Sequence, residues 1–352
     1  MMNRKKLNAL KYMNVLVLPI LAWISFQTHG WLTYLPLIES FLFIPLLELT
    51  YTPDSRNLTD EKEALRKDDP IYDWQLYIMV PIQFGLLIMF LFSMQEVGLS
   101  LIDKVGRISA MGLMCGVIGI NVAHELGHRK TWYEQLMAKG LLLTSLYMHF
   151  FIEHNRGHHK NVSTEEDPSS ARRGESLYGF WVRSVVYSYL SAWSLEADRL
   201  RKIAKSPVSL SNEMLQFQLI QMTLLIVIFI TYGTEVTIYF MLSATLGFLL
   251  LETVNYIEHY GLRREKVGNR YERTMPAHSW NSNHIIGRMM LFELSRHSDH
   301  HYIASRKYQV LRYMSDSPQM PTGYPGMMLL ATLPPLWFRV MNDNIDNFKK
   351  TL

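Results

Sequence analysis

Nine of the thirteen histidines in this 352-residue chain fall in four short groups. HELGH holds two of them, EHNRGHH three, NYIEHYG one and RHSDHH three. Imidazole is the commonest metal ligand in proteins, and it suits iron, copper, nickel and zinc. Spacings of three or four residues place the members of a group on one face of a helix. The histidines are His124, His128, His154, His158, His159, His259, His297, His300 and His301.

The number of grouped histidines predicts more than one metal ion. A single zinc takes about three or four protein ligands. Nine histidines exceed that need and suit two ions, so we predict a dinuclear site ligated almost wholly by nitrogen. The other histidines, His29, His149, His278 and His284, lie outside metal-ligand spacing, and we expect structural or surface roles for them.

The composition limits the other classes of function. The net charge is only +4, which gives no strong nucleic-acid footprint. The single cysteine, Cys115, excludes a disulfide framework and any iron–sulfur or rubredoxin-type domain in this chain. No G-x-G-x-x-G follows an expected strand, and we expect this chain to bind no flavin, haem or nicotinamide. Electrons for redox chemistry would therefore come from a partner.

Long apolar runs predict an all-α integral membrane protein with about six transmembrane helices, since a bilayer requires about 20 apolar residues per span. Charged segments separate the apolar runs. The expected spans are 10–28, 32–50, 75–95, 107–126, 214–233 and 236–256.

Charge and parity predict the orientation of these spans. The basic run RKK at 4–6 favours a cytoplasmic N-terminus. Six spans then leave the segments 51–74, 127–213 and 257–352 in the cytoplasm, with all four histidine groups on that side of a bacterial inner membrane. A further apolar segment, 136–152, would separate two of the groups if it crossed. We expect it to lie in or along the membrane interface.

The identity of the metal is less constrained than its site. HELGH alone is typical of zinc proteases, with Glu125 as a general base. The three further histidine groups argue against a protease, which needs only one or two more ligands. Nitrogen ligands favour iron over magnesium or calcium, whereas copper and zinc remain compatible with them. We prefer non-haem iron, because apolar substrates dissolve in the adjoining membrane and their oxidation requires activated O2.

The motifs HELGH, EHNRGHH, NYIEHYGL and SRHSDHH, in this order, resemble those of the membrane-bound alkane 1-monooxygenase family. That family belongs to the integral-membrane desaturases and hydroxylases. The resemblance extends to EEDPSSARRGES at 165–176, HSWNSNH at 278–284 and the tail at 318–342, and covers most of the chain from about residue 70. It implies a di-iron site, O2 as oxidant, and hydroxylation of the terminal carbon of alkanes taken from the membrane. It also implies electrons from rubredoxin and its reductase.

The chain departs from the family pattern after the last histidine group. Members commonly carry LQRHSDHHA and then a proline, whereas this chain has LSRHSDHHYIASRKYQ, with Ser295 and Tyr302. The departure keeps the histidines and leaves substrate identity open. The alternatives are an aromatic-methyl monooxygenase, which would act on substrates such as xylene, and an acyl-lipid desaturase or hydroxylase. A zinc protease and a non-enzymatic metal carrier are further alternatives.

Four carboxylates stand beside expected ligands in the sequence, namely Glu125, Glu153, Glu258 and Asp299. A carboxylate that accepts the outer ring N–H fixes the tautomer of a ligand histidine. Each is therefore a candidate to hold a ligand histidine through its outer ring nitrogen, although a charged surface explains any one of them equally well.

Basic residues predict a docking face for an acidic electron carrier. The candidates are Arg172, Arg173, Arg306 and Lys307. Opposite charges steer such encounters. A solvated, positively charged cytoplasmic face explains the same residues. Asn121 and Asn255, near the histidine groups, are expected either to support the ligands or to cap and join helices.

Overall fold

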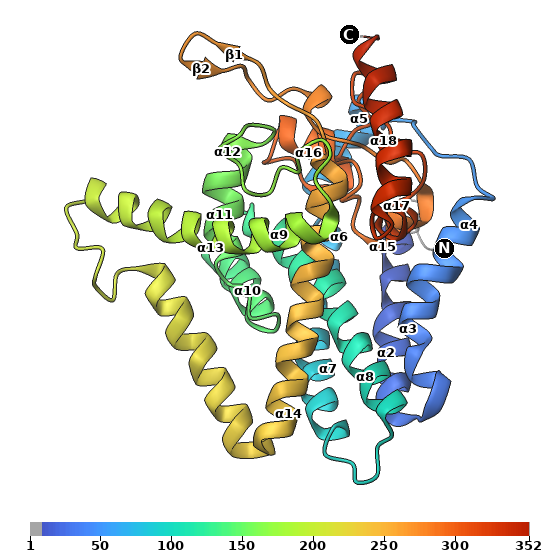
Figure 1. Cartoon of the computed structure of the whole chain (residues 1–352), viewed down its shortest axis with the longest axis vertical. Coiled ribbons are helices and arrows are strands. Elements are labelled where there is room, and N and C mark those ends of the chain that lie inside the picture. The colour runs from blue at the N-terminus through green and yellow to red at the C-terminus, as the bar shows by residue number, and fades with distance from the viewer. Residues whose placement is uncertain (1–8, 352) are drawn as a thin grey trace.

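The computed structural model describes residues 9–351 and is mainly helical. The basic run at 4–6, used above to orient the chain, lies outside the described residues. Figure 1 shows long helices running along the molecule and several short helices gathered at one end, here called the histidine end. The short helices that carry histidines are α9 (Asn121–Gly127), α12 (His159–Asn161) and α16 (His297–Tyr302), with α11 (Phe150–Glu153) beside them.

Within residues 9–351, four helical stretches are long and apolar enough to cross a membrane: Gly30–Glu48, Pro70–Ser93, Leu101–Gly127 and Glu213–His259. A shorter helical segment precedes them and overlaps the expected span at 10–28. The segment consists of η1 (Lys11–Leu16) and α2 (Val17–Gln27). The first long stretch consists of η2 (Gly30–Tyr34), α3 (Leu35–Ile38), η3 (Glu39–Phe43) and α4 (Ile44–Glu48), and the second of α6 (Pro70–Tyr77) and α7 (Met79–Ser93). The third consists of α8 (Leu101–Met114), η4 (Cys115–Ile120) and α9, and the fourth is the single helix α14 (Glu213–His259).

Helix α14 contains two of the expected spans, 214–233 and 236–256. Its backbone leaves helical geometry at Gly233, with φ +82° and ψ 179°. Glycine adopts this positive φ without the cost that a Cβ imposes. Figure 1 shows the two halves meeting in a sharp bend at the end of the molecule away from the histidine end. The second half therefore returns and delivers His259 to the histidine end.

Capping residues start two helices earlier than the apolar runs predict. Helix α8 begins inside the expected connection 96–106, because Ser100 and Asp103 form a reciprocal capping box. Helix α6 begins at Pro70, where the carboxylate of Asp69 accepts a bond from the backbone N–H of Ile71. The expected solvated segment 51–74 also contains a short charged helix, α5 (Asp60–Lys67).

The ambiguous apolar segment 136–152 does not form one continuous helix. Helix α10 (Trp132–Leu143) ends before Leu146, which has a positive φ of 50°, and α11 begins only at Phe150. A 12-residue helix is about 18 Å long, which is shorter than the hydrocarbon core of about 30 Å. Its position in a bilayer stays a prediction.

Helix α13 (Leu177–Lys202) lies across the long helices in Figure 1. Its side chains Val182, Tyr187 and Leu190 are exposed. An exposed apolar face on a helix with this orientation is typical of a helix at the membrane surface.

Glycines allow α8 and α14 to approach closely. A Cβ at Gly247 would lie 2.4 Å from the Cβ of Cys115, and a Cβ at Gly112 would lie 2.7 Å from the Cβ of Leu246. Such contacts between small residues are typical of helix pairs in membranes. This close packing holds α8, which leads to HELGH, against α14, which ends at His259.

The C-terminal third closes the histidine end. It includes a short antiparallel hairpin, in which Lys266 pairs with Tyr271, in a fold that is otherwise mainly helical, as we predicted. The remaining elements are β1 (Lys266–Val267), β2 (Arg270–Tyr271), η6 (Pro276–His278), α15 (Ile285–Met290), η7 (Tyr308–Val310), α17 (Tyr324–Ala331) and α18 (Pro334–Lys349).

Candidate metal centre

The nine predicted histidines lie together in two groups. In each group one ring nitrogen per residue lies within 4.8 Å of all the others. The four histidine-bearing segments thus converge as predicted. The two that lie closest in the sequence, HELGH and EHNRGHH, are separated by the break between α10 and α11. Group one is His124, His128, His154, His159 and His300, and group two is His158, His259, His297 and His301.

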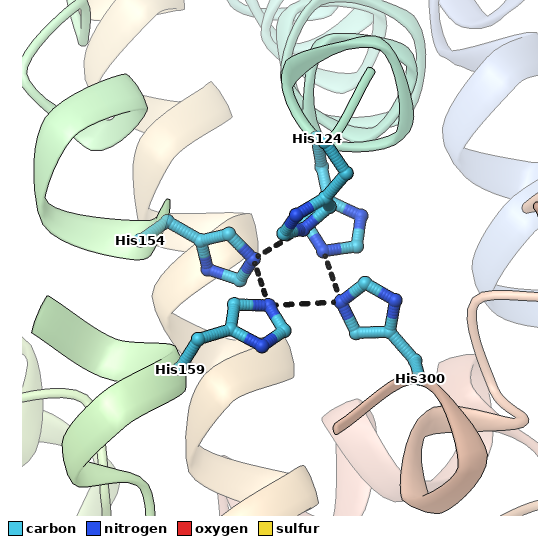
Figure 2. Close-up of side chains that lie close together, drawn as sticks. His124, His154, His159 and His300 are labelled. Carbon is cyan, nitrogen blue, oxygen red and sulfur yellow. Dashed lines mark hydrogen bonds between the residues drawn. The ribbon is translucent and has the colours of Figure 1, made fainter. Parts of the chain in front are cut away.

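The Nε2 atoms of group one face one another. The Nε2 of His124 is 3.0 Å from that of His300, and the Nε2 of His159 is 3.1 Å from those of both His154 and His300. Figure 2 shows these rings pointing toward a common centre from different helices. Two nitrogens bound at about 2.0–2.1 Å from one ion, at right angles, lie about 3 Å apart. The spacing therefore fits a metal ion.

Group two has the same arrangement with four residues. The Nε2 of His301 is 2.8 Å from that of His297 and 3.2 Å from that of His158. The Nε2 of His259 lies 3.2 Å from that of His297. Each neutral ring carries one proton on two nitrogens, so facing Nε2 atoms cannot all be satisfied by each other. A metal cation that accepts these lone pairs would resolve the conflict.

A π-helical turn divides EHNRGHH between the groups. Residues His154–His158 form the π-helix η5, whose hydrogen bonds join residues five apart. His154 therefore meets His159, while His158 turns into group two. The rings of His154 and His158 do stack, with centres 5.2 Å apart, but the two residues belong to different groups. Helix α16 is divided as well, with His300 in group one and His297 and His301 in group two.

Burial favours the neutral form of four histidine rings that lie outside the membrane-spanning stretches. It lowers the pKa of His128 to about 3. Burial first, and neighbouring imidazoles second, lower the pKa values of His154, His159 and His300 well below the usual range. Only a neutral imidazole offers the lone pair that binds a metal. These four rings are thus in their ligand form at neutral pH.

Asp167 supports the site, and sequence reasoning missed it. Its Oδ2 lies 2.9 Å from the Nδ1 of His158, the outer nitrogen of that ring. Ser170 Oγ donates to the same oxygen, and the backbone N–H of Ser169 donates to Oδ1. The carboxylate is buried. Asp167 lies nine residues after His158 in a turn, so the only available signal was its place in the EEDPSS motif.

Glu258 touches the site from an unexpected side. Its Oε2 is 3.1 Å from the Nε2 of His297, the nitrogen that faces group two, rather than from the outer nitrogen. The hydroxyl of Tyr324 donates to its Oε1 at 2.7 Å. Glu258 thus stands at the edge of the candidate metal position.

The other three carboxylate candidates have different surroundings. Glu125 accepts a bond from Arg129 at 2.6 Å and another from the backbone N–H of Tyr308. Asp299 accepts from Arg306 and from the backbone N–H of Arg312. These two anchor arginines and loops near the histidines. The Glu153 candidate is buried, and its Oε1 would lie 2.6 Å from a Cβ on Gly157.

The remaining histidines lie outside both groups. His278 contacts Glu272 at 3.2 Å, and the Nδ1 of His284 is 2.9 Å from Ser282 Oγ. His29 is exposed beside Glu96, at the other end of α8, and His149 packs between aromatic rings.

The two asparagine candidates make bonds that join or brace helices. Asn121 donates to the carbonyl of Leu291 at 3.2 Å, and Asn255 donates to Glu252 at 3.3 Å.

The four docking candidates differ in how available their charges are. Arg306 and Lys307 are half-buried and form ion pairs with Asp299 at 2.9 Å and Asp73 at 2.8 Å. These pairs compensate two of the charges on the expected docking face. Arg173 is exposed and pairs with Asp346 on α18, and Arg172 is exposed. A docking role stays a prediction, and it now depends mainly on Arg172.

An apolar cavity reaches both histidine groups. His124 and His154 of group one and His297 of group two line it, together with Glu258. Apolar side chains from several helices form most of the remaining wall. They include Leu18, Phe41, Val117, Leu250, Met290 and Met328.

Comparisons with known proteins agree with this arrangement. The family model described as fatty acid desaturase matches residues 105–331. Alkane 1-monooxygenase 1 of Pseudomonas aeruginosa is 42% identical over 86% of this chain and 80% of its own length. Alkane 1-monooxygenase 2 of the same organism is 40% identical over 94% and 89%. The xylene/toluene monooxygenase hydroxylase component XylM of Pseudomonas putida is 28% identical over 79% and 75%.

The chain therefore belongs to the fatty acid desaturase family, whose matched region contains all nine histidines. Identity over nearly the whole chain then assigns it, within that family, to the alkane 1-monooxygenases. It is an enzyme and an oxidoreductase, which confirms the resemblance noted in the motifs.

Proposed function

We propose that this enzyme hydroxylates the terminal carbon of alkanes or alkyl chains to primary alcohols, using two iron ions and O2. One observation carries the proposal: two groups of histidine nitrogens open onto a single apolar cavity. The names of the relatives support the same substrate class.

The nine histidines are proposed to hold the two ions, five at group one and four at group two. Nitrogen ligands favour redox-active iron over magnesium or calcium. When bound, the ions supply the binding and reductive activation of O2. The reaction consumes an alkane, O2, two electrons and two protons, and it yields an alcohol and water.

The chain's own residues position the substrate and exclude water. The apolar side chains of the cavity wall would bind a hydrocarbon, and its polar lining includes Asn121 and Glu258 beside three of the histidines. Tyr324 holds the Glu258 carboxylate there through its 2.7 Å bond. Burial of each methylene contributes about 0.8 kcal/mol, so discrimination between chain lengths is gradual.

We also propose the orientation and the electron source. The chain would cross a bacterial inner membrane six times, counting η1–α2 and both halves of α14, with the histidine end in the cytoplasm. The apolar helices Gly30–Glu48, Pro70–Ser93, Leu101–Gly127 and Glu213–His259 support a membrane location. Rubredoxin, reduced by its reductase, is the proposed donor, because one cysteine cannot hold an iron–sulfur centre in this chain.

Metal and product analysis tests the proposal. The full chain, purified in lipid nanodiscs, should contain about two irons per chain. With NADH, rubredoxin reductase, rubredoxin and O2, it should convert alkanes to primary alcohols identified by mass spectrometry. Xylenes and fatty acyl substrates should be assayed in parallel, because XylM is also a relative. One zinc without iron would contradict the di-iron site, and turnover of xylene or acyl chains without alkane turnover would contradict the substrate class.

A further inference from the structure

A basic hairpin formed by residues 263–273 connects both histidine groups to the protein surface. Arg264 in its first arm donates to the carbonyl of Lys160 at 2.9 Å, directly after His159. In its second arm, the Arg273 guanidinium lies 5.0 Å from the ring centre of Tyr302, directly after His301. The base of the hairpin therefore rests on segments that carry a histidine from each group.

The base of the hairpin is held rigidly. The backbone N–H of Arg264 donates to Ser163 at 2.8 Å, and Ser163 Oγ donates to the carbonyl of His278 at 2.7 Å. Glu265 and Glu272 join the two arms through backbone and side-chain bonds of 3.0 and 2.8 Å. These contacts fix the hairpin relative to the histidines, so a protein bound to it would have a defined position.

The hairpin is strongly positive. It has five basic residues and two acidic ones, a net charge of +3 over eleven residues. Lys266, Arg270 and Arg273 are exposed, as is Val267, which is 71% accessible at the tip. Exposed Arg172 lies beside the base, where burial and its charge lower the pKa of Arg263. Basic residues around one exposed apolar side chain suit an acidic protein surface.

We propose that the basic hairpin is the docking surface for an acidic, soluble electron carrier that reduces the metal centre. The inference rests on the proposed function, because it names where the electrons of that reaction enter. It moves the docking face from Arg306 and Lys307, whose charges are paired within the chain, to Lys266 and Arg270. Figure 1 shows the hairpin projecting beyond α12, away from the long helices, which favours a soluble partner over lipid headgroups.

Charge reversal tests the proposal in the full chain loaded with metal in nanodiscs. The variant K266E/R270E is compared with K349E/K350E, which reverses two exposed lysines on α18 and at its end. Rubredoxin serves as the probe, and its binding is measured directly by biolayer interferometry. Hydroxylation is measured with rubredoxin and, separately, with reduced methyl viologen, a small donor that needs no docking surface.

For K266E/R270E we expect about tenfold weaker rubredoxin binding and a matching rise in KM for rubredoxin at low salt, since both charges change from attractive to repulsive. The difference should shrink at 1 M salt, where the Debye length is about 3 Å. Viologen-driven turnover should stay within about twofold, and K349E/K350E should behave as wild type.

Three results would overturn the proposal. They are unchanged rubredoxin binding by K266E/R270E, an equal loss in K349E/K350E, and a loss seen only in nanodiscs with anionic lipid, which would assign the hairpin to headgroups. If wild type bound rubredoxin through the hairpin but formed no alcohol with either donor, the proposed function would fail and the docking surface would stand.

Discussion

Replacing Asp167 by asparagine should weaken metal binding at group two while sparing group one. Asp167 accepts the outer N–H of His158 at 2.9 Å, so it fixes the tautomer that turns Nε2 toward the group. Asparagine keeps the shape and removes the charge. Loss of such a partner typically costs about 10–100-fold in metal affinity, which is about 1.4–2.8 kcal/mol. Group one contains no histidine bonded to Asp167 and should keep its affinity.

The assay is metal content after dialysis against graded chelator. The wild type should lose its two ions at similar chelator concentrations, whereas D167N should fall to about one ion per chain at a concentration about 10–100-fold lower. The control is D103N, which removes another buried, hydrogen-bonded carboxylate at the start of α8, away from the histidine end. D103N should retain both ions. Equal chelator resistance in D167N and wild type would refute the role of Asp167.

Three further predictions concern the division of the site, the packing of the long helices and the topology. His154→Ala and His297→Ala should each remove about one ion, because the two residues belong to different groups; loss of both ions from each would argue for one inseparable centre. Gly247→Leu should lower the free energy of unfolding by about 1–3 kcal/mol through the clash with Cys115. Gly85→Leu, where nothing lies within 4 Å, is its control, and thermal unfolding in detergent measures both. With Cys115 replaced, cysteines introduced at exposed Lys130 and Glu165 should be labelled from the same side of the membrane; labelling from opposite sides would contradict the proposed topology.

The ligand set could be predicted from the sequence because its chemistry is local. Histidines three to five residues apart must lie near each other on a helical turn, and four such groups imply convergence. The division of the histidines into two groups could not be predicted, because His154 meets His159 through a π-helical turn that no residue type in the sequence indicates. Asp167 was missed for a related reason, since its contact with His158 depends on a tight turn rather than on helix spacing.

Long-range pairing explains what the sequence misjudged on the surface. The sequence predicts an available positive charge at Lys307. In the structure it pairs with Asp73, which is 234 residues away in the chain. Glu258 shows the same limit: its neighbour in sequence is His259, whereas the ring it contacts belongs to His297. Apolar runs located the long helices well, but capping by Asp69 and Ser100 decided where two of them begin.

The crowding of nine imidazoles at the histidine end has a consequence for the amount of this protein that a cell can maintain. In the described chain the Nδ1 atoms of His259, His297 and His301 have no hydrogen-bond partner, and the Nε2 atoms crowd one another. A ligand that binds only the folded state stabilises it by RT ln(1 + [L]/Kd), about 2.7 kcal/mol at one hundred times Kd. Each bound ion would therefore protect the fold as well as serve the reaction. Cells short of metal should then hold fewer copies of this chain, because the less stable metal-free form is cleared by proteolysis.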